Sequence, residues 1–353
     1  MDRIPFAFWT HLCHISLSSD VTEAKELSGP FGELSQIAFH HMLQYVTVVE
    51  EGIEKLSYLH YWCTDREERG HQEIERISKK FVRTLTINFK DTKPEIVSRK
   101  LIQRFPHAIP NFQFFCSSIS EAWVDFACSL KRFSQVLITK KLDDRSVGLL
   151  QRVIDTRKLL VFTVCEKACE GGILATLKSL LCQDQFREVE VRSSSRRPWE
   201  SGVVSELLQF WSQNSEKLKG KRLVLERKCE GGVQQLEKFL IYSGSSSFGI
   251  LRRMTVFMAR YFLLQQTLKV CSREECDVIK KEYRHNYRRF HKPSCVYKFE
   301  EGEGSERRRL YISFECATAR ERRSARPKLP ASHKGLDDLG LMRATSWLEV
   351  LFA

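Results

Sequence analysis

The sequence contains two copies of a strand–turn–helix pattern, and both copies have the same four residues at the turn. Leu160–Val164 is a β-rich stretch that leads to Cys-Glu-Gly-Gly at 169–172, and Leu223–Leu225 leads to the same four residues at 229–232. After each glycine pair, apolar residues recur at steps of three and four, which is typical of an amphipathic helix. A strand–turn–helix unit that repeats in local sequence indicates an array of stacked units.

The alternation of strand and helix extends along most of the chain. Further strands are expected at 84–89, 111–115, 136–139, 186–191 and 251–257, and further helices near 96–102, 120–130, 147–154, 202–211 and 273–290. Parallel neighbours need a crossover connection, and this connection is usually a helix. Seven strands that alternate with helices therefore predict parallel pairing.

Two layouts satisfy this alternation: an open, leucine-rich-repeat-like array, and a doubly wound sheet with helices on both faces. The stretch 186–192 favours the first, because it contains four charged residues, Arg187, Glu188, Glu190 and Arg192. A parallel strand that is covered on both faces is almost continuously apolar. We therefore expect an α/β fold with an open strand–helix array, in which one face of the sheet is exposed to water.

Residues 1–55 are expected to form a small helical module ahead of this array. Apolar residues recur at three- and four-residue steps in two places, Phe8–Ile15 and Leu34–Val49. Pro5 suits the first turn of the earlier helix, because a residue at that position needs no amide hydrogen. Residues 56–83 are then expected to be a linker helix that leads into the array.

The repeated strand–helix domain is expected to span residues 84–316 and to end in a β-hairpin. The strands of this hairpin, Ser294–Phe299 and Arg308–Cys316, flank an acidic turn that contains glycine. Such a hairpin would cap the open end of the array. Residues 317–353 begin with a stretch rich in Arg, Ser and Pro and are expected to be a mostly disordered basic tail, in which apolar Trp347–Phe352 has no assigned role.

Composition narrows the class of protein. Hydrophobic residues make up 42% and charged residues 29% of the 353 residues, as in globular proteins. No apolar run is long enough for a membrane helix, and no secretory signal opens the chain. The 12 cysteines include no Cys-x-x-Cys pair, which suggests free thiols in a reducing compartment. We therefore expect a soluble intracellular protein, cytoplasmic or nuclear, with no membrane partner.

The formal net charge of +13 favours an acidic partner, but the basic residues are spread over the whole length. Short basic clusters are not interleaved with aromatic residues, so nucleic-acid binding is the less favoured function. One group mixes possible metal ligands without the spacing of a zinc site: Cys271, Cys276, His285, His291 and Cys295. No metal and no other cofactor is expected.

The glycine pairs Gly171–Gly172 and Gly231–Gly232 follow strands, as phosphate-binding glycines do. They belong to neither G-x-G-x-x-G nor G-x-x-x-x-G-K-[ST], and the Glu before each pair would repel phosphate. Their expected role is structural, a tight turn from strand to helix. The chain also lacks the G-x-S-x-G and H-E-x-x-H motifs, so we expect it not to be an enzyme.

The N-terminal residues Ile4-Pro5-Phe6-Ala7-Phe8-Trp9-Thr10-His11-Leu12, followed by a second helix around Leu34–Tyr45, resemble the opening of an F-box. With the strand–helix repeats that follow, the arrangement looks like the lineage-expanded F-box-like proteins of nematodes, whose C-terminal halves form leucine-rich-repeat-like substrate-binding domains. The resemblance covers the chain to about Cys316.

This resemblance implies a substrate-recognition subunit of an SCF-type ubiquitin ligase. Its N-terminal helices would bind a Skp1-like adaptor subunit in a helix-in-groove contact, and its array would hold an unknown protein target. The residues implied in the Skp1-type contact are Ile4, Pro5, Phe6, Phe8, Trp9 and Leu12. Two other functions stay open: a stand-alone repeat scaffold whose N-terminal helices dock on its own core, and a basic nucleic-acid-binding protein.

Overall fold

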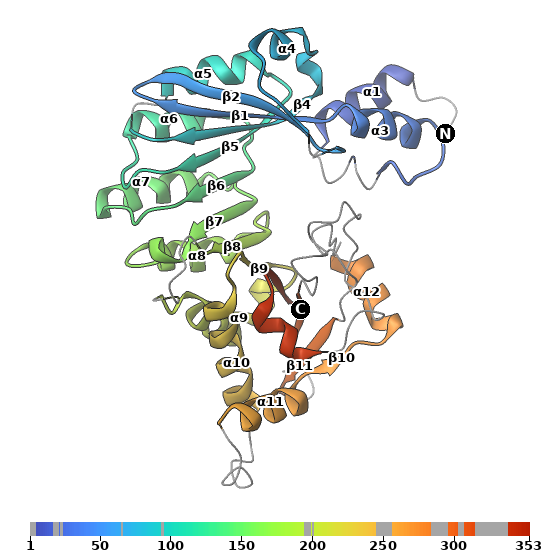
Figure 1. Ribbon diagram of the computed structural model, residues 1–353, viewed down its shortest axis with the longest axis vertical. Coiled ribbons are helices and arrows are strands. Elements are labelled where there is room, and N and C mark those ends of the chain that lie inside the picture. Colours follow the sequence, from blue (N-terminus) through green and yellow to red (C-terminus); the bar gives the residue numbers. More distant parts are fainter. Residues whose placement is uncertain are drawn as a thin grey trace. The chain divides into compact units, whose positions relative to one another are not determined.

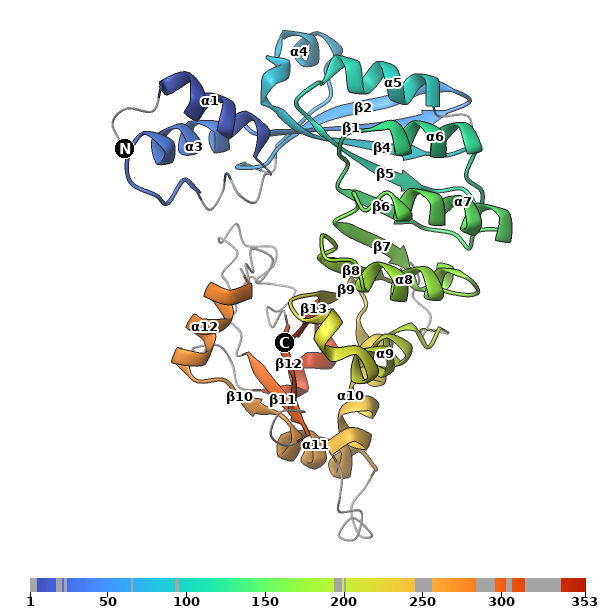
Figure 2. The same ribbon diagram turned by 180° about the vertical axis from the view of Figure 1, so that it is seen from behind.

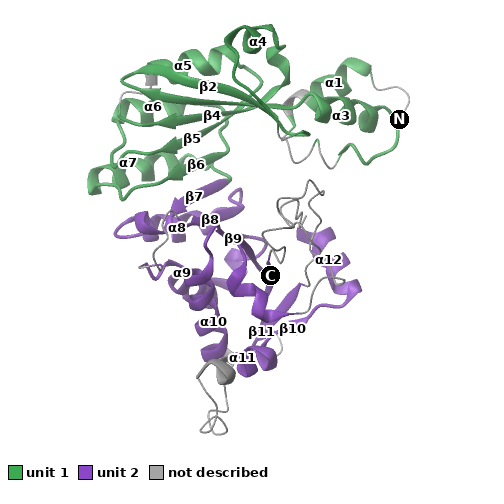
Figure 3. Ribbon diagram, in the orientation of Figure 1, with its two compact units in different colours: residues 1–160 green, residues 161–353 purple. Residues whose placement is uncertain are grey.

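The computed structural model describes residues 5–16, 21, 24–64, 66–92, 95–193, 199, 201–244, 256–283, 296–302, 307–314 and 338–353. The chain divides into two compact units, unit 1 with residues 1–160 and unit 2 with residues 161–353 (Figure 3). In each unit, helices alternate with parallel strands of an open sheet, and antiparallel strands extend that sheet (Figure 1). The predicted α/β class with alternating strands and helices is therefore confirmed at this level.

The sheet of unit 1 has the strand order β6–β5–β4–β1–β2–β3. Strands β1, β4, β5 and β6 pair in parallel, and β2 and β3 add to the β1 edge in antiparallel fashion. The strands are β1 (Leu43–Glu50), β2 (Ile53–Tyr61), β3 (Glu67–Glu68), β4 (Val82–Phe89), β5 (Ile109–Phe114) and β6 (Gln135–Ile138). The helices are α1 (Phe6–Ile15), α3 (Pro30–His40), α4 (His71–Arg76), η1 (Lys79–Phe81), α5 (Glu95–Arg104), α6 (Glu121–Ser129) and α7 (Asp144–Asp155).

The core of unit 1 lies between one face of this sheet and the helices α5, α6 and α7, which stand side by side (Figure 2). Trp123 of α6 is fully buried, with its ring centroid 4.7 Å from that of Phe114 and 5.2 Å from that of Phe112. Ser120 begins α6 because its hydroxyl accepts a hydrogen bond from the amide of Trp123 at 3.2 Å. The aromatic side chains that alternate along the strands thus fix the helical layer.

The sheet of unit 2 has the order β10–β11–β12–β13–β9–β8–β7. Strands β7, β8 and β9 are parallel, and the remaining strands join β9 in antiparallel fashion. The strands are β7 (Val161–Cys165), β8 (Glu188–Arg192), β9 (Arg222–Glu226), β10 (Lys269–Val270), β11 (Tyr297–Glu301), β12 (Arg308–Phe314) and β13 (Trp347–Phe352). The helices are η2 (Glu166–Ala168), α8 (Ile173–Leu181), α9 (Val203–Leu218), α10 (Glu230–Gly244), α11 (Val256–Thr267), α12 (Arg273–Tyr283) and η4 (Leu339–Ala344).

Helices pack on both faces of the unit 2 sheet. Phe352 of β13 stacks on Trp211 of α9, with ring centroids 6.1 Å apart. Its neighbour Leu351 belongs to the other face of the strand, because successive side chains alternate. There Leu351 joins a buried cluster with Ile279 of α12 and Tyr311. The helix α12 therefore covers part of the face that α9 leaves free.

Six of the seven expected strands are present, as β4 to β9. The seventh, at 251–257, is not confirmed, since 251–255 lie outside the described residues and α11 begins at Val256. These six strands were predictable because short runs of β-branched and aromatic residues are bounded by turns.

The predicted helix at Leu34–Val49 is wrong beyond His40, where α3 ends, because Leu43–Tyr61 forms the antiparallel strands β1 and β2. The predicted linker helix at 56–83 is confirmed only in part, because β2 and β3 occupy its earlier residues and the short helices α4 and η1 its later ones. The physical reason is local: Val, Thr and Tyr crowd β1, and these residues favour extended backbone. Glu51 and Gly52 both have positive φ, 56° and 72°, as a tight hairpin turn requires.

The predicted disordered tail is wrong for residues 338–353, and residues 317–337 lie outside the described residues. All six residues of β13 are buried, and this strand lies between β9 and β12. The predicted hairpin strands pair as β11 and β12, but β13 separates them from β9. The hairpin is therefore not a cap on the last parallel strand; the apolar end of the chain occupies that position.

Candidate functional site

The predicted partner-binding residues of the N-terminal helices divide by exposure. Pro5, Phe6 and Phe8 are exposed, Trp9 and Leu12 are half-buried, and Ile4 lies outside the described residues. Phe6 is 66% exposed and Phe8 is 51% exposed. Each of these exposed aromatic side chains is apolar area that a partner can bury with a gain in free energy.

The inner side of α1 is held by the chain itself. The ring of Trp9 packs on Phe31 of α3, with centroids 5.4 Å apart. Cys13 is buried with its Sγ 3.5 Å from the hydroxyl of Ser35. The guanidinium of Arg83, at the start of β4, donates a hydrogen bond to the carbonyl of Cys13 at 2.5 Å, and burial lowers the pKa of Arg83. Helix α1 is thus fixed while Phe6 and Phe8 stay exposed.

The two glycine pairs have different roles. Gly171 has a positive φ of 71° and lies in the turn that precedes α8, and Gly172 is the N-cap of that helix. Gly231 and Gly232 instead lie inside the first turn of α10, against Trp199. A Cβ on Gly231 would lie 2.6 Å from atoms of that indole. The turn predicted for the second pair is wrong, because its glycines make room for a side chain.

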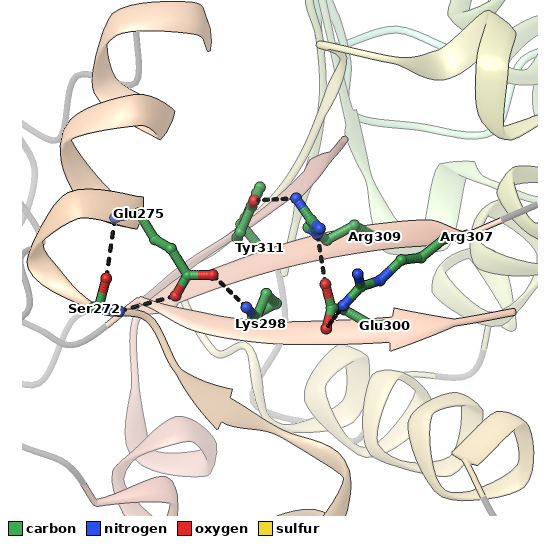
Figure 4. Close-up of polar contacts among 7 residues, drawn as sticks. All are labelled: Ser272, Glu275, Lys298, Glu300, Arg307, Arg309 and Tyr311. Carbon is green, nitrogen blue, oxygen red and sulfur yellow. Dashed lines mark hydrogen bonds and ion pairs between the residues drawn. The ribbon is translucent and has the colours of Figure 1, made fainter. Parts of the chain in front are cut away.

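A polar cluster joins α12 to β11 and β12 (Figure 4). Glu275 of α12 pairs with Lys298 of β11, which lowers the pKa of Glu275 and raises that of Lys298. Ser272 and Glu275 also form a capping box, since the Ser272 hydroxyl accepts from the amide of Glu275 at 3.2 Å and the Ser272 amide donates to the Glu275 carboxylate at 3.0 Å.

The second half of this cluster joins β11 to β12, because Glu300 belongs to β11 and both Arg309 and Tyr311 belong to β12. Glu300 accepts hydrogen bonds from Arg309 at 2.8 Å and from Arg307 at 2.5 Å, and Arg309 donates to the hydroxyl of Tyr311 at 3.1 Å. Burial raises the pKa of Tyr311. Each of these charged groups has a partner of opposite charge within the cluster, and the pair of Glu275 and Lys298 is the part that links α12 to the sheet.

Four carboxylates and two guanidinium groups meet on neighbouring strands of unit 2: Glu188, Glu190, Glu226, Glu349, Arg192 and Arg222. Glu190 is only 2% exposed, accepts a hydrogen bond from the Thr163 hydroxyl at 2.7 Å and lies 3.0 Å from Arg192. The prediction that the charges of β8 face water is therefore wrong for Glu190. The ion pair with Arg192 of the same strand and the hydrogen bond from Thr163 of β7, not solvent, compensate the burial of this charge.

The sheet face of unit 1 opposite α5, α6 and α7 carries two rows of side chains that no helix of the described residues covers (Figures 1 and 2). Strand register places one row in the order Tyr58, Val46, Thr86, Asn111, Gln135. The second row runs Leu56, Val48, Asn88, Gln113, Leu137. We call these ten residues the amide face, because hydroxyl and carboxamide groups are its polar members.

The amide face holds unused hydrogen-bonding groups. Gln44, beside the rows on β1, donates from its amide nitrogen to the Thr86 hydroxyl at 2.8 Å. The Oδ1 atoms of Asn88 and Asn111 are buried and accept no hydrogen bond from any described residue. Sequence analysis missed this site, although Thr84, Thr86 and Asn88 alternate with apolar residues along β4 and mark the second face.

Chemistry at a metal or a thiolate finds no support in the described part of the chain. There, no three His, Cys, Asp or Glu side chains are placed to hold a metal ion, and His285, His291 and Cys295 lie outside it. Burial raises the pKa of Cys271 to about 12 and also raises that of Cys169, so neither thiol is activated. None of the helices in the described ranges combines the length and the apolar composition that a membrane span requires.

No protein-family model, no curated protein and no solved structure matches the chain. The fold itself defines the class: an α/β protein with an open sheet whose central strands are parallel. Its two candidate interaction surfaces are the exposed aromatic pair of α1 and the amide face of unit 1.

Proposed function

We propose that the chain is a protein-interaction adaptor, the substrate-recognition subunit of an SCF-type ubiquitin ligase. The observation that supports this proposal is the exposure of Phe6 and Phe8 on a helix whose opposite side is fixed to its own module. A Skp1-like subunit would cover the two rings, and a protein target would bind to the strand–helix domain.

The energetics of burial favour such a contact. Covering a phenylalanine ring gains about 1.5–3 kcal/mol, so two exposed rings supply a useful share of the binding free energy. Phe6 and Phe8 are two positions apart in the ten-residue helix α1 and so leave it in different directions, and a partner that covers both must wrap around the start of this helix. Because α1 is already folded and anchored by Arg83, little ordering entropy opposes binding.

Co-purification with a Skp1-like subunit tests the proposal. We expect the intact protein to retain this subunit, and Phe6→Asp or Phe8→Asp to weaken retention tenfold or more, because a carboxylate would be buried in an apolar groove. Ile96→Asp is the matched control, since Ile96 on α5 is also an exposed apolar residue. Failure of the intact protein to retain the subunit, or equal retention by all variants, contradicts the proposal.

A stand-alone scaffold is the second candidate, and the bond between Arg83 and Cys13 favours it, because α1 then supports β4. Under this function, deletion of residues 1–40, which leaves β1 intact, lowers the free energy of unfolding and costs no binding partner. Chemical denaturation measures the first effect, and pull-down of a Skp1-like subunit measures the second. Loss of that subunit on deletion, from an intact protein that retains it, excludes the scaffold.

A further inference from the structure

We infer that a row of basic side chains at one edge of the unit 1 sheet binds an acidic, extended segment of a target polypeptide. This inference rests on the proposed adaptor function, for which it names a binding surface and the chemical class of the target. We call the row the basic edge. Its members are Lys79, Lys80, Lys131, Arg132, Arg157 and Lys158.

Parallel pairing brings these residues together, although they lie far apart in the sequence. Strands β4, β5 and β6 run in one direction, so the residues that precede each strand meet at the same edge of the sheet. One dibasic pair precedes β4, a second precedes β6, and the third follows α7. The third pair lies beside the second, because the amide of Leu160 donates to the carbonyl of Ser134 at 3.1 Å.

The segments at this edge contain no acidic residue. They hold seven basic residues, the six of the basic edge and Arg83, and neither Asp nor Glu. These segments are 41–42, 78–83, 105–108, 130–134 and 156–160. The opposite edge of the same sheet is mixed in charge, with three lysines and four acidic residues. Its segments are 51–52, 90–92, 115–118 and 139–144. Only the first of these two edges therefore attracts an anionic partner.

Two of the six cations have a role within the fold. The guanidinium of Arg132 donates to the carbonyl of His107 at 3.4 Å. The ammonium of Lys158 donates to the carbonyls of Cys128 and Leu130, at 2.6 and 2.7 Å. Carbonyl groups beyond a helix C-terminus favour such cations. Helix capping thus explains one residue of the second pair and one of the third.

The other residue of each of these pairs has no such role. Lys131 and Arg157 are exposed, and their side chains form no hydrogen bond and no ion pair with a described residue. Arg157 follows the C-cap of α7 and has a positive φ of 53°, a conformation in which glycine is usual. Arginine strains the backbone at this position, and strain of this kind is typical of functional sites.

A buried charge behind the edge strengthens its positive potential. Arg83 is 4% exposed, and burial together with the like charge of Arg132 lowers its pKa. The two guanidinium groups are therefore close enough to repel each other. A carboxylate bound at the basic edge would relieve this repulsion.

The spacing of the pairs sets the size of the occupant. From β4 across β5 and β6 to the segment beside it, three strand spacings of about 4.8 Å give roughly 14 Å. An extended chain advances about 3.3 Å per residue, so about five residues fit along the edge. Successive side chains of an extended chain alternate in direction, and acidic residues at alternate positions would therefore all face the edge.

The edge suits carboxylates better than nucleotides. Proteins that bind single-stranded nucleic acid combine basic residues with exposed aromatic rings on which bases stack. Of the aromatic rings at this edge, Phe105 and Phe133 are buried, and the ring of Phe81 packs on that of His41 with centroids 4.9 Å apart. The edge therefore offers charge without a stacking surface.

Fluorescence anisotropy with a labelled peptide and the purified full chain tests the inference. The probe is a peptide of about ten residues that alternates glutamate with serine. We expect it to bind, and a peptide with glutamine in place of glutamate to bind at least tenfold more weakly. Failure of the acidic peptide to bind, or equal binding of both peptides, would overturn the inference.

Charge-reversal variants locate the site. The double variant Lys131→Glu with Arg157→Glu should lower the affinity for the acidic peptide at least tenfold. The matched control is Lys100→Glu with Lys140→Glu, which changes the net charge equally at two exposed lysines away from the edge. Near physiological ionic strength, where charges about 8 Å apart are already screened, the control should stay within threefold. Equal loss in both double variants would contradict a specific site.

Arg157→Gly separates binding from folding. Glycine adopts a positive φ without strain, so the midpoint of thermal unfolding should stay equal or rise. The affinity for the acidic peptide should nevertheless fall severalfold, and unchanged affinity would count against the edge. Tighter binding of single-stranded RNA or of phosphatidylserine vesicles than of the peptide, lost in the Lys131→Glu and Arg157→Glu double variant, would assign the edge to another partner and overturn the inference.

The Phe8→Asp variant distinguishes this inference from the proposed function. The variant should bind the acidic peptide as the intact protein does, because α1 contributes no residue to the basic edge. Peptide binding without any retention of a Skp1-like subunit by the intact protein refutes the ligase role and supports the edge. Retention of the subunit without peptide binding refutes the edge and supports the ligase role.

Discussion

At the scale of single residues, Gly231 and Gly232 are explained by packing and not by turn geometry. Trp199 occupies the space beside both, and its indole nitrogen donates to the carbonyl of Lys228 at 2.9 Å. The identical Cys-Glu-Gly-Gly sequences suggested identical turns, yet only Gly171 has a positive φ. Local sequence cannot distinguish the two cases, because Trp199 lies about thirty residues earlier in the chain and reaches α10 only through the fold.

Gly231→Ala tests the packing role. Alanine favours a helix by about 1 kcal/mol over glycine, but here its Cβ would overlap the Trp199 side chain, and such overlap costs about 1–3 kcal/mol. We therefore expect a net loss in the free energy of unfolding, measured by chemical denaturation. Gly148→Ala in α7 is the control, since no atom lies within 4 Å of its added Cβ, and it should raise the free energy of unfolding. Stabilisation by both substitutions contradicts the packing role.

At the scale of elements, strands with a strong local signal were predictable and strands defined by distant partners were not. The runs that became β4 to β9 were recognised by their β-branched and aromatic residues. A helix was predicted where β1 lies, because apolar residues recur at three- and four-residue steps from Leu34 onward. This spacing obscured the strand-like alternation that includes Val46 and Val48. The apolar end of the chain offered no local clue to its partners, because β13 pairs with β9, more than one hundred residues earlier.

The candidate sites were also predictable only where they depend on residues close together in the sequence. Phe6 and Phe8 were singled out in the sequence because they lie in the segment that resembles an F-box, but their exposure could be read only from the structure, which leaves Trp9 half-buried. The amide face needed the register of five strands before its rows could be recognised. A row across a sheet joins residues such as Thr86 and Gln135, which sequence spacing alone does not relate.

The attachment of α12 is predicted to depend on pH through Glu275 and Lys298. The pKa of Glu275 is lowered, so its contribution is present at neutral pH and is lost as pH falls through that lowered value. The pKa of Lys298 is raised, so its contribution is present at neutral pH and is lost only as pH rises through that raised value. The pair therefore stabilises α12 over the range between.

Amide hydrogen exchange of α12 measures this effect. At pH 7, Glu275→Gln should exchange severalfold faster than the intact protein, because the ion pair with Lys298 is lost. The difference between the two proteins should shrink steadily as pH falls, because protonation of Glu275 leaves a neutral carboxyl group that resembles the carboxamide of the variant. Comparison at equal pH cancels the intrinsic exchange rates. A difference that does not shrink as pH falls assigns the effect to packing and contradicts the ionic role.

At the scale of the whole molecule, the stability of unit 2 depends on its last strand, β13. Strand β13 contributes pairing to both β9 and β12, and all six of its residues are buried. Truncation after Ala344 would remove this strand, leave both neighbours with unpaired edges and open the cluster around Ile279. The burial of each apolar side chain contributes about 1.5–3 kcal/mol. The loss of several of them together exceeds the free energy of unfolding of an ordinary domain. We therefore expect the truncated protein to lose the cooperative unfolding transition of unit 2. Near-ultraviolet circular dichroism, to which the buried Trp211 contributes, measures this transition.

Removal of Ala353 alone is the control. The amide of Ala353 donates to the carbonyl of Arg309 at 2.9 Å, so its removal should lower the free energy of unfolding by only about 1 kcal/mol. If the end of the chain were a disordered tail, both truncations would leave the transition unchanged, and that result would contradict the central position of β13 in unit 2.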